Sequence, residues 1–585
     1  MGALPTASPT TYDLLPTCHG CPMRLDPLSA ARWLFGPGPA ARPGYSWPRW
    51  LFLRALGFIF FTAFYSLFFQ IRGLIGPHGI LPAAQYLQLV SQRLGVRGVW
   101  YAPTLLWLGS GNRALMVLCW AGLVAAVLLM LNLWPRAALV VCVTAFLSFV
   151  SAARDFSEYQ SDGMLLEAGF LSWFFAPPGL RPGLGESHPP SRGSLFLLRW
   201  ECLRIYFESG VVKLASGDPQ WRHLTAMDHY YQNGPLPDWI GWYVQQLPHG
   251  FHAAAALLTL VLELGLIWMC FLQRRWRILL FFIVTPFQIS IILTANLGFL
   301  NYLVLVLGIL LLDDRFLCRV FPRLGLRRNR KLEIRNSKSE TGDSEVITWK
   351  LESGSTKLDT QDLKSQPGLG AVQRSSFIIH RLQAVTRHWS LLFSGLFLSW
   401  IFYNTSVLLL LYLFRSLPVP LAPVIALEPF RISNQYGLFA VMTTARYEIE
   451  FQGTRDGENW VAYPFRYKPQ DPRQPPRIHA PYQPRLDWNL WFASLGLWRQ
   501  YPWVVRTEGL LLRNDSSVLS LFAGNPFSSE PPRAVRAVVW QYWFTDLKTK
   551  KEEGLWWRRE VHGLYAPALE RDTAGNITVL QEPLQ

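Results

Sequence analysis

The chain has 585 residues, of which 50% are apolar and only 16% are charged. Soluble domains carry about 25% charged residues, so this composition, with 26 Trp and 37 Phe, argues against a soluble globular protein and for a membrane protein. The net charge of +16 does not indicate nucleic-acid binding, because Arg and Lys gather at the ends of apolar segments and in one connecting loop, where they set membrane orientation.

The N-terminal tail, residues 1–49, is rich in Pro, Gly and Ala and lacks the apolar core of a signal peptide. Within it, Cys18 and Cys21 have the C-x-x-C spacing of redox and metal sites. No strand pattern precedes the pair and no second pair follows it, so we interpret both as ordinary cysteines of a loose tail. We expect no metal site and no cofactor.

The next part of the chain, residues 50–312, is a series of apolar segments. The first, 50–71, is long enough to cross a hydrocarbon core about 30 Å thick. Further spans are expected at about 114–134, 137–153, 195–215, 251–272, 277–295, 297–312 and 389–414. The shorter stretch 164–178 is expected to re-enter the membrane or to lie at its surface. The sequence therefore predicts a polytopic α-helical membrane bundle of six to nine spans.

Polar side chains inside these segments are candidate functional residues, because ionisable groups are costly within a bilayer. They are Asp162, Glu167, Glu201, Arg204, Glu208 and Lys213. Arg204 and Glu208 share one helix face and can neutralise each other and Glu167 across a helix interface. One interpretation is a buried ion-pair network that stabilises the bundle, and the other is a polar cavity in which Lys213 or Glu167 meets a substrate. Glu263, Asn296 and Asn301 are expected to form inter-helix hydrogen bonds.

The loop 313–388 begins with a cluster of Arg and Lys and continues as a Ser-, Lys- and Glu-rich stretch whose composition predicts disorder. Arg42 and Arg49 similarly precede the first span. By the positive-inside rule the tail and this loop are expected in the cytoplasm. The last span, 389–414, then places residues 430–585 on the opposite side of the membrane.

Residues 430–585 are long enough for one compact domain, which we expect to be a β-rich α+β fold. Alternating residues at 445–453 and 461–467 flank the turn Asp456-Gly457 and predict a hairpin. The segment has no cysteine and must be stable by packing alone. Asn514 and Asn576 are glycosylation sequons, and the sequence does not decide whether either is modified.

The stretch 481–496 concentrates charged and aromatic residues in what we predict to be a short helix. Asp487 lies in its first turn, and Arg485 is expected to pair with Asp487 or a neighbouring acid. Trp, Tyr and Arg dominate protein–protein hot spots, so the candidate binding residues for a partner protein are Tyr436, Arg485, Asp487, Trp488 and Trp491. We expect Trp491 in the core and Trp488 partly exposed. No nucleophile with a partnered base lies nearby, so we propose no catalytic residue.

Several long stretches together carry a family resemblance. They include GLIGPHGILPA (73–83), DGMLLEAGFL (162–171), SGVVKL (209–214), NQYGLF (434–439) and PYQPRLDWNLWFASLG (481–496). Beyond about residue 48 the chain resembles the lipase maturation factors. The resemblance implies a membrane-resident, chaperone-like factor whose partners are secreted lipases or other exported client proteins and membrane lipids. It implies the endoplasmic reticulum membrane in a eukaryote and the inner membrane in a bacterium, with residues 430–585 as an extracytoplasmic client-binding domain.

Two features suggest departures or alternatives. The Pro-rich tail and the loop at about 325–385 are not expected from that family. The transmembrane half also resembles vitamin K-dependent carboxylases, in which a lysine in a stretch similar to Gly210–Leu214 serves as a base. The alternative function is therefore an integral membrane enzyme that acts on a lipid or quinone, with a carboxylase-like polar cluster around Lys213.

Overall fold

A computed structural model describes residues 34–36, 44–157, 159–322, 369–414, 416, 418–572 and 574–583, with the backbone alone for 369–388 and 390. Cys18, Cys21 and Arg42 lie outside the described residues, as do most of the predicted tail and residues 323–368 of the predicted loop.

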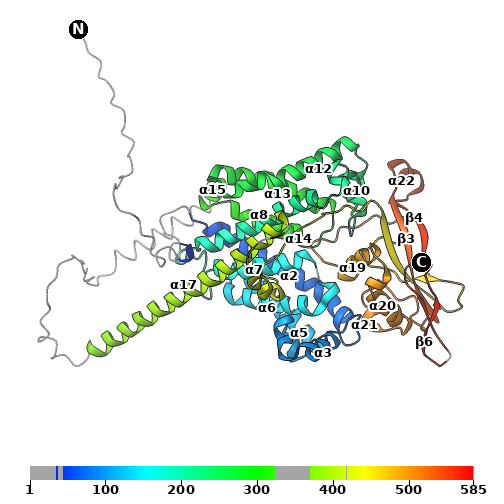
Figure 1. Cartoon of the computed structure of the whole chain (residues 1–585), viewed down its shortest axis with the longest axis horizontal. Coiled ribbons are helices and arrows are strands. Elements are labelled where there is room, and N and C mark those ends of the chain that lie inside the picture. Colours follow the sequence, from blue (N-terminus) through cyan, green and yellow to red (C-terminus); the bar gives the residue numbers. More distant parts are fainter. Residues whose placement is uncertain are drawn as a thin grey trace, which may run out of the picture.

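The membrane part is a bundle of helices (Figure 1). Its main helices are α2 (Ser46–Ile75), α5 (Asn112–Met130), α6 (Pro135–Ala153), α7 (Gln160–Phe175), α8 (Arg192–Ala215), α12 (His249–Leu264), α13 (Arg274–Thr294), α14 (Leu300–Gly308) and α17 (Leu369–Leu413). Shorter helices are α3 (Ala83–Leu94), α4 (Gly98–Tyr101), α9 (Pro219–Arg222), α10 (Ala226–Asn233), α11 (Trp239–Gln245), α15 (Asp314–Val320) and α18 (Ala422–Leu427). Within the described chain, six helices are long and apolar enough to cross a membrane, which confirms the predicted polytopic bundle.

The helix ends meet at two opposite ends of the bundle. At one end, Arg49 donates to the carbonyl of His188 (2.7 Å), Asp314 accepts from the backbone N–H of Trp47 (2.8 Å), and Arg274 pairs with Asp313. We call this the basic end. The other end, which includes Gln70, Asp162 and Asn296, contacts the C-terminal domain, and we call it the docking end.

α7 joins the two ends of the bundle instead of lying at its surface. Asp162 in its first turn reaches the C-terminal domain, while the carbonyl of Ala176, just after its end, accepts from Arg136 (2.9 Å) at the basic end. Its sixteen residues extend about 24 Å at 1.5 Å per residue. Neighbouring helices bury this stretch on nearly all sides. The expectation that 164–178 re-enters the membrane or lies at its surface stays a prediction.

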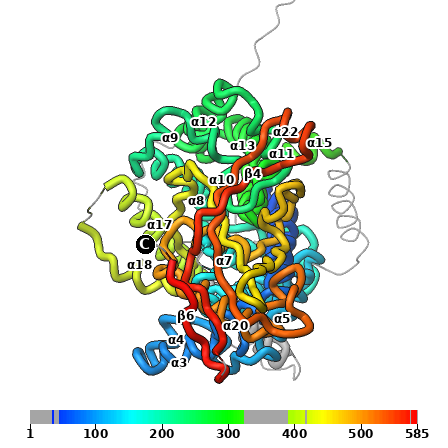
Figure 2. Tube along the Cα trace, turned by 90° about the vertical axis from the view of Figure 1, so that its right-hand side faces the viewer, coloured from blue at the N-terminus to red at the C-terminus, as the bar shows by residue number. Residues whose placement is uncertain are grey.

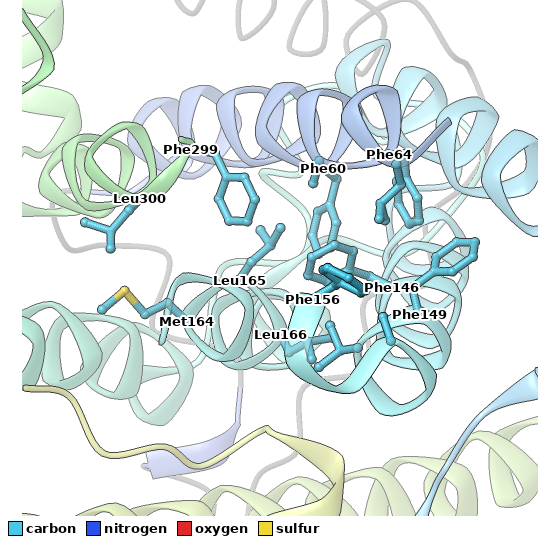
Figure 3. Close-up of a cluster of buried hydrophobic side chains, with 14 of the residues drawn as sticks. Phe60, Phe64, Phe146, Phe149, Phe156, Met164, Leu165, Leu166, Phe299 and Leu300 are labelled. Carbon is cyan, nitrogen blue, oxygen red and sulfur yellow. The ribbon is translucent and has the colours of Figure 1, made fainter. Parts of the chain in front are cut away.

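The centre of the bundle is packed with phenylalanine rings (Figure 3). Phe64 of α2 and Phe146 of α6 meet edge to face with centroids 5.8 Å apart, and Phe60 contacts the same Phe146 ring at 6.2 Å. Gly122 of α5 makes room for them, because a Cβ there would lie 2.4 Å from the Phe64 ring. Ring pairs of this kind fix how α2, α5 and α6 pack.

The C-terminal domain is a six-stranded antiparallel sheet covered on one side by helices. The strands are β1 (Arg446–Thr454), β2 (Val461–Ala462), β3 (Ala534–Phe544), β4 (Trp557–Leu564), β5 (Ala568–Arg571) and β6 (Ile577–Gln581). The order is β2-β1-β3-β5-β6, and β4 also pairs with β3. The pairing of Gln452 with Ala462 confirms the predicted β1–β2 hairpin.

Helices α19 (Arg485–Ser494), α20 (Trp503–Leu512) and α21 (Ser516–Leu519) lie between this sheet and the docking end, whereas α22 (Leu547–Glu553) lies near the end of the sheet (Figure 1). Viewed from the side of the sheet, β4 and β6 pass in front of the bundle helices (Figure 2). The indole N–H of Trp242 in α11 donates to the carbonyl of Trp556 (3.1 Å). The sheet, its helices and the bundle therefore form successive layers.

Candidate functional site

Arg485 joins the C-terminal domain to the bundle. Its guanidinium donates to both carboxylate oxygens of Asp162 in α7, over 2.8 and 2.9 Å. It also donates to the carbonyl of Phe156 (2.6 Å) and to the hydroxyl of Ser157 (3.2 Å). Both charged side chains are fully buried, and a bidentate arginine–carboxylate pair is among the stronger polar contacts. Two predicted candidates from distant parts of the sequence thus form one ion pair.

Two side-chain amides hold the segment that precedes α19. Gln70 of α2 accepts from the backbone N–H of Arg485 (2.7 Å) and donates to the carbonyl of Gln483 (2.9 Å). Asn296, just after α13, accepts from the backbone N–H of His479 (2.6 Å) and donates to the carbonyl of Arg477 (2.7 Å). These amides satisfy backbone groups that have no partner in a sheet or helix. Asn296 also donates to the carbonyl of Pro237 (3.3 Å), so it binds the C-terminal segment as well as its own part of the bundle.

A second polar cluster lies deeper in the bundle. Arg204 of α8 forms a salt bridge with Glu167 of α7. The hydroxyl of Tyr436 donates to Glu167 (2.8 Å), and its backbone N–H donates to Glu208 (2.6 Å). The guanidinium carbon of Arg204 lies 5.1 Å from the centroid of the Tyr436 ring. All four residues are buried, and each charge faces an opposite charge or a donor, as buried ions require.

Tyr436 reaches this depth because residues 432–443 run along α7 and α8 before the chain enters β1. Side chains of the bundle accept from this segment: Gln160 from the N–H of Gly437 (2.9 Å) and Asp218 from the N–H of Met442 (2.7 Å). The Asn434 carbonyl accepts from Arg204 (2.7 Å). The two domains therefore share polar contacts within the bundle as well as at its surface.

Lys213 is paired with Glu263 of α12. Its ammonium donates to both carboxylate oxygens, over 3.0 and 2.8 Å, and lies 5.1 Å from the centroid of the Trp221 ring. This arrangement is the inter-helix ion pair of the structural interpretation, with an added cation–π contact. It gives no support to the enzyme alternative, because the ammonium is held by a carboxylate instead of facing a second catalytic group.

Glu201 lies three residues before Arg204 on α8 and is fully buried. Neither of its carboxylate oxygens has a side-chain or backbone hydrogen bond to the described part of the chain. The structure thus places it in the same helix as the second cluster without a bond to it.

Trp488 and Trp491 have the opposite placement from the one expected. Trp488 is 8% exposed, packs against Leu297, and lies edge to face with Tyr159 at 5.9 Å. Trp491 is half-buried, and its indole N–H donates to the carbonyl of Asn233 (3.0 Å). The expectation of a core Trp491 and a partly exposed Trp488 is wrong, because the bundle covers the face of α19 that carries Trp488.

Three further candidate binding residues are inaccessible in this conformation. Tyr436 and Arg485 are fully buried, and Asp487 accepts from the backbone N–H groups of Tyr467 and Lys468, both at 3.2 Å. Burial raises the pKa of Asp487 to about 6. Arg485 does not pair with Asp487, as the sequence suggested, because it reaches Asp162 instead. Tyr436 and Arg485 hold the two domains together, Asp487 holds its own domain together, and a partner cannot touch any of the three here.

The stretch 481–496 nevertheless borders an open cleft. A cleft of about 780 Å³ lies where residues 155–161, 437–443 and 488–503 meet. Phe492 and Leu495 of the α19 region line it and are 37% and 44% exposed. We call it the junction cleft, and it offers apolar and aromatic surface to a ligand or partner.

A second hollow, which we call the membrane cavity, lies among α8, α12, α13 and α14 near the docking end. Its volume is about 480 Å³, and Lys213 and Glu263 line it. Leu297, Leu300, Leu438 and Phe439 line both the membrane cavity and the junction cleft.

Sequence analysis missed several residues that hold the two domains together. Gln70, Gln160, Asp218 and Asn434 all bind across the domain boundary. Gln70 carried a usable signal, because it is a polar residue within a predicted membrane span. The others lie near helix ends or in loops, where polar residues are common and give no such signal.

Comparison with known families identifies two matching regions. Residues 47–319 match the lipase maturation factor transmembrane domain, and residues 432–567 match the lipase maturation factor C-terminal domain. The second region begins within the segment that runs along α7 and α8.

Known relatives are similar over most of the chain. Lipase maturation factor 1 of Bos taurus is 32% identical over 578 residues, covering 95% of each chain. Lipase maturation factor 2 of Gallus gallus is 33% identical, covering 88% of this chain and 80% of the relative. Lipase maturation factor 1 of Homo sapiens is 32% identical, covering 91% of both. No solved structure matches the chain.

Proposed function

Because the chain belongs to the lipase maturation factor family, we propose that it is a membrane-resident factor that assists the folding and assembly of secreted lipases. The observation that carries this proposal is the presence of both family regions in one chain, with relatives similar along nearly its whole length. The enzyme alternative has no comparable support, since Lys213 is paired and the relatives are named as maturation factors.

The proposed organisation keeps the orientation expected from the sequence. Residues 1–49 form a cytoplasmic tail, 50–312 the membrane domain, 313–388 a cytoplasmic loop, 389–414 the last span and 430–585 an extracytoplasmic domain. The clustering of Arg49, Arg274 and Arg315 at or next to the basic end supports this, because cytoplasmic ends of membrane helices are enriched in Arg and Lys. In a eukaryotic cell the domain would then face the lumen of the endoplasmic reticulum.

The junction cleft is the proposed client-binding site. An incompletely folded lipase exposes apolar segments that its native core will later bury, and the cleft presents Phe492, Leu495 and one face of Trp491 to such a segment. Aromatic side chains are favoured in such contacts because they bury a large area with few rotatable bonds. The proposal moves the client surface away from the buried Arg485 and Trp488.

The test is a charge placed in the cleft. Phe492→Asp and Leu495→Asp are expected to lower the specific activity of a co-expressed secreted lipase several-fold, and to reduce its co-purification with the full chain. The reason is that a carboxylate opposes an apolar client, while both positions are exposed enough to leave the fold intact. The measurement is lipase activity per unit of lipase antigen in cells that lack the endogenous factor.

Val579→Asp is the matched control, because Val579 is an exposed apolar residue on β6 and does not line the cleft. It should leave lipase activity unchanged. If deletion of the whole protein leaves lipase specific activity unaltered, the maturation function is wrong. If deletion lowers the activity and the cleft variants do not, the function stands and the client binds elsewhere.

A further inference from the structure

The membrane cavity is formed mostly by the surfaces of membrane helices. Its walls come chiefly from α8, α12, α13 and α14, and α10 closes one side. Within their most apolar windows, only 33% of the α12 region and 17% of α13 are buried inside the protein. Part of the remaining surface lines the cavity, through Ala254, Leu258 and Ser290, and the rest is available to the surrounding lipid.

Small residues line the side of the cavity that α12 and α13 form. Ala254 and Ala255 of α12 and Ser290 of α13 line the cavity. Larger side chains at these positions would fill the space between the two helices, whereas these leave it open. The volume of about 480 Å³ is in the lower half of the about 300–1,000 Å³ typical of small-molecule sites.

The two charged side chains that form an ion pair in the cavity have opposite charges, which cancel. Lys213 and Glu263 form an ion pair, and both side chains are at least nine-tenths buried. An anionic ligand would approach the Glu263 carboxylate, and a cationic ligand would approach the Lys213 ammonium, so neither gains a net attraction. An uncharged ligand avoids both penalties.

One acceptor in the cavity is left without a donor. Asn301 is 5% exposed, and its Nδ2 donates to Gln288 (2.7 Å), whose own amide donates to the Tyr206 hydroxyl (2.8 Å). The Oδ1 atom of Asn301 has no hydrogen-bond partner within the described chain. All three side chains line the cavity. A buried carbonyl oxygen in this state needs a donor, and a water or a ligand hydroxyl can supply one.

We propose that the membrane cavity binds an uncharged single-chain lipid with a hydroxyl-bearing head group, of the monoacylglycerol class. The acyl chain occupies the apolar wall of α12 and α13, and a head-group hydroxyl donates to Oδ1 of Asn301. The lipid enters from the bilayer between these two helices. This inference is independent of the client function, because its test reads lipid binding and not lipase activity.

The experiment uses the full chain in lipid nanodiscs and a photoactivatable, clickable monoacylglycerol as the probe. Labelling is expected on peptides of α12, α13 or α14. Unlabelled monooleoylglycerol should compete for it, while oleate and methyl oleate, which are anionic and lack a hydroxyl respectively, should compete at least about fivefold less well.

Variants link this labelling to the cavity. Ala255→Trp should reduce labelling at least about fivefold by filling the space. Leu257→Trp is the matched control, since Leu257 is on the same helix, is 51% exposed and does not line the cavity. Ser290→Phe narrows the cavity from α13 and replaces Ala255→Trp if that variant does not fold. Asn301→Leu should abolish the preference for monooleoylglycerol over methyl oleate while labelling persists.

Two outcomes would overturn the proposal. One is labelling that Ala255→Trp and Ser290→Phe leave unchanged in folded protein, which would place the lipid outside the cavity. The other is equal competition by oleate, methyl oleate and monooleoylglycerol, which would show apolar partitioning without recognition of a hydroxyl.

Discussion

Arg485 and Asp487 are two residues apart, yet they hold different parts of the protein. Residues at i and i+2 of a helix point to different sides, so the two side chains cannot pair. Arg485 turns toward α7 and Asp162, while Asp487 accepts from the backbone of Tyr467 and Lys468 within its own domain. The same short helix therefore fastens both to the bundle and to the sheet domain.

Asp487 and His479 give the C-terminal domain two opposed responses to pH. Burial raises the pKa of Asp487 to about 6 and lowers the pKa of His479 to about 4, and both side chains contact the backbone of Tyr467. The native state keeps the Asp487 proton that the unfolded chain releases above pH 4, so stability from this group falls as pH rises toward 6. The unfolded chain protonates His479 below about pH 6.5 while the native state does not, so stability from this group rises between pH 4 and 6.5.

The prediction concerns two conservative variants. In His479→Gln only Asp487 of the two groups still titrates, so the free energy of unfolding of this variant should fall as the pH rises from 4 to 6. In Asp487→Asn only His479 still titrates, so the free energy of unfolding should rise over the same range. The total change in the free energy of unfolding is about 3 kcal/mol in each variant, at 1.36 kcal/mol per pKa unit. Thermal unfolding of the full chain in detergent, followed by tryptophan fluorescence from pH 4 to 7, measures both. Parallel profiles for both variants and the wild type would contradict the assignment.

At the scale of elements, α8 shows how charged helices are placed in the bundle. It carries Arg204 and Lys213, and both turn inward to carboxylates on α7 and α12. Polar contacts of this kind hold membrane helices together, because lipid gives apolar faces little reason to associate. Lipid-exposed α12 and α13 instead carry long apolar faces.

The link between α7 and α19 gives the element-scale prediction. Arg485→Leu leaves Asp162 buried without its partner and should lower the free energy of unfolding by about 3–5 kcal/mol. The double variant Asp162→Leu/Arg485→Leu should recover part of that loss, since no lone charge remains buried. Thermal unfolding and protease sensitivity near residue 480 measure the effect.

Arg513→Leu is the control for this experiment, because Arg513 is an exposed arginine next to α20. Its unfolding should match that of the wild type. A double variant as unstable as the sum of the two single variants would show that the pair is not coupled.

At the scale of the whole molecule, the ends of the bundle helices gather at two opposite ends. Residues 44–49, the basic end and residues 313–314 lie together, and the C-terminal domain covers the opposite end (Figure 1). Residues 432–443 then bind within the bundle, so the sheet domain is held by the interior of the membrane part as well as by its surface.

The proposed orientation, with residues 430–585 outside the cytoplasm, predicts which of the two sequons is glycosylated. Asn576 is exposed in the turn between β5 and β6, where its side chain donates only to Asp572 of the same turn (3.2 Å). Asn514 is half-buried, and its side chain donates to the carbonyl of Phe527 (3.1 Å) and accepts from Asn525 (2.8 Å). In a eukaryotic secretory pathway, a glycosidase-sensitive shift in mobility should be lost in Asn576→Gln and kept in Asn514→Gln. Glycan on Asn514 would contradict the local structure, and no glycan on either would contradict the orientation.

The sequence by itself determined the helical bundle, the β1–β2 hairpin and the family resemblance. The bundle and the hairpin depend on local period and composition, which a chain displays without knowledge of its partners. The resemblance depends on the residue order of several long stretches, such as 73–83 and 481–496. It also singled out Glu167, Arg204 and Lys213, because charges inside apolar segments are conspicuous.

Only the tertiary structure decided what these residues contact. Arg485 and Asp162 are 323 positions apart, and Tyr436 and Glu167 are 269 apart, so no spacing rule relates them. The predicted exposure of Trp488 and burial of Trp491 were wrong for the same reason. A helical period shows that α19 has an apolar face, but it does not show that the bundle covers that face. The junction cleft and the membrane cavity are likewise products of packing, since their walls come from segments that meet only in the folded chain.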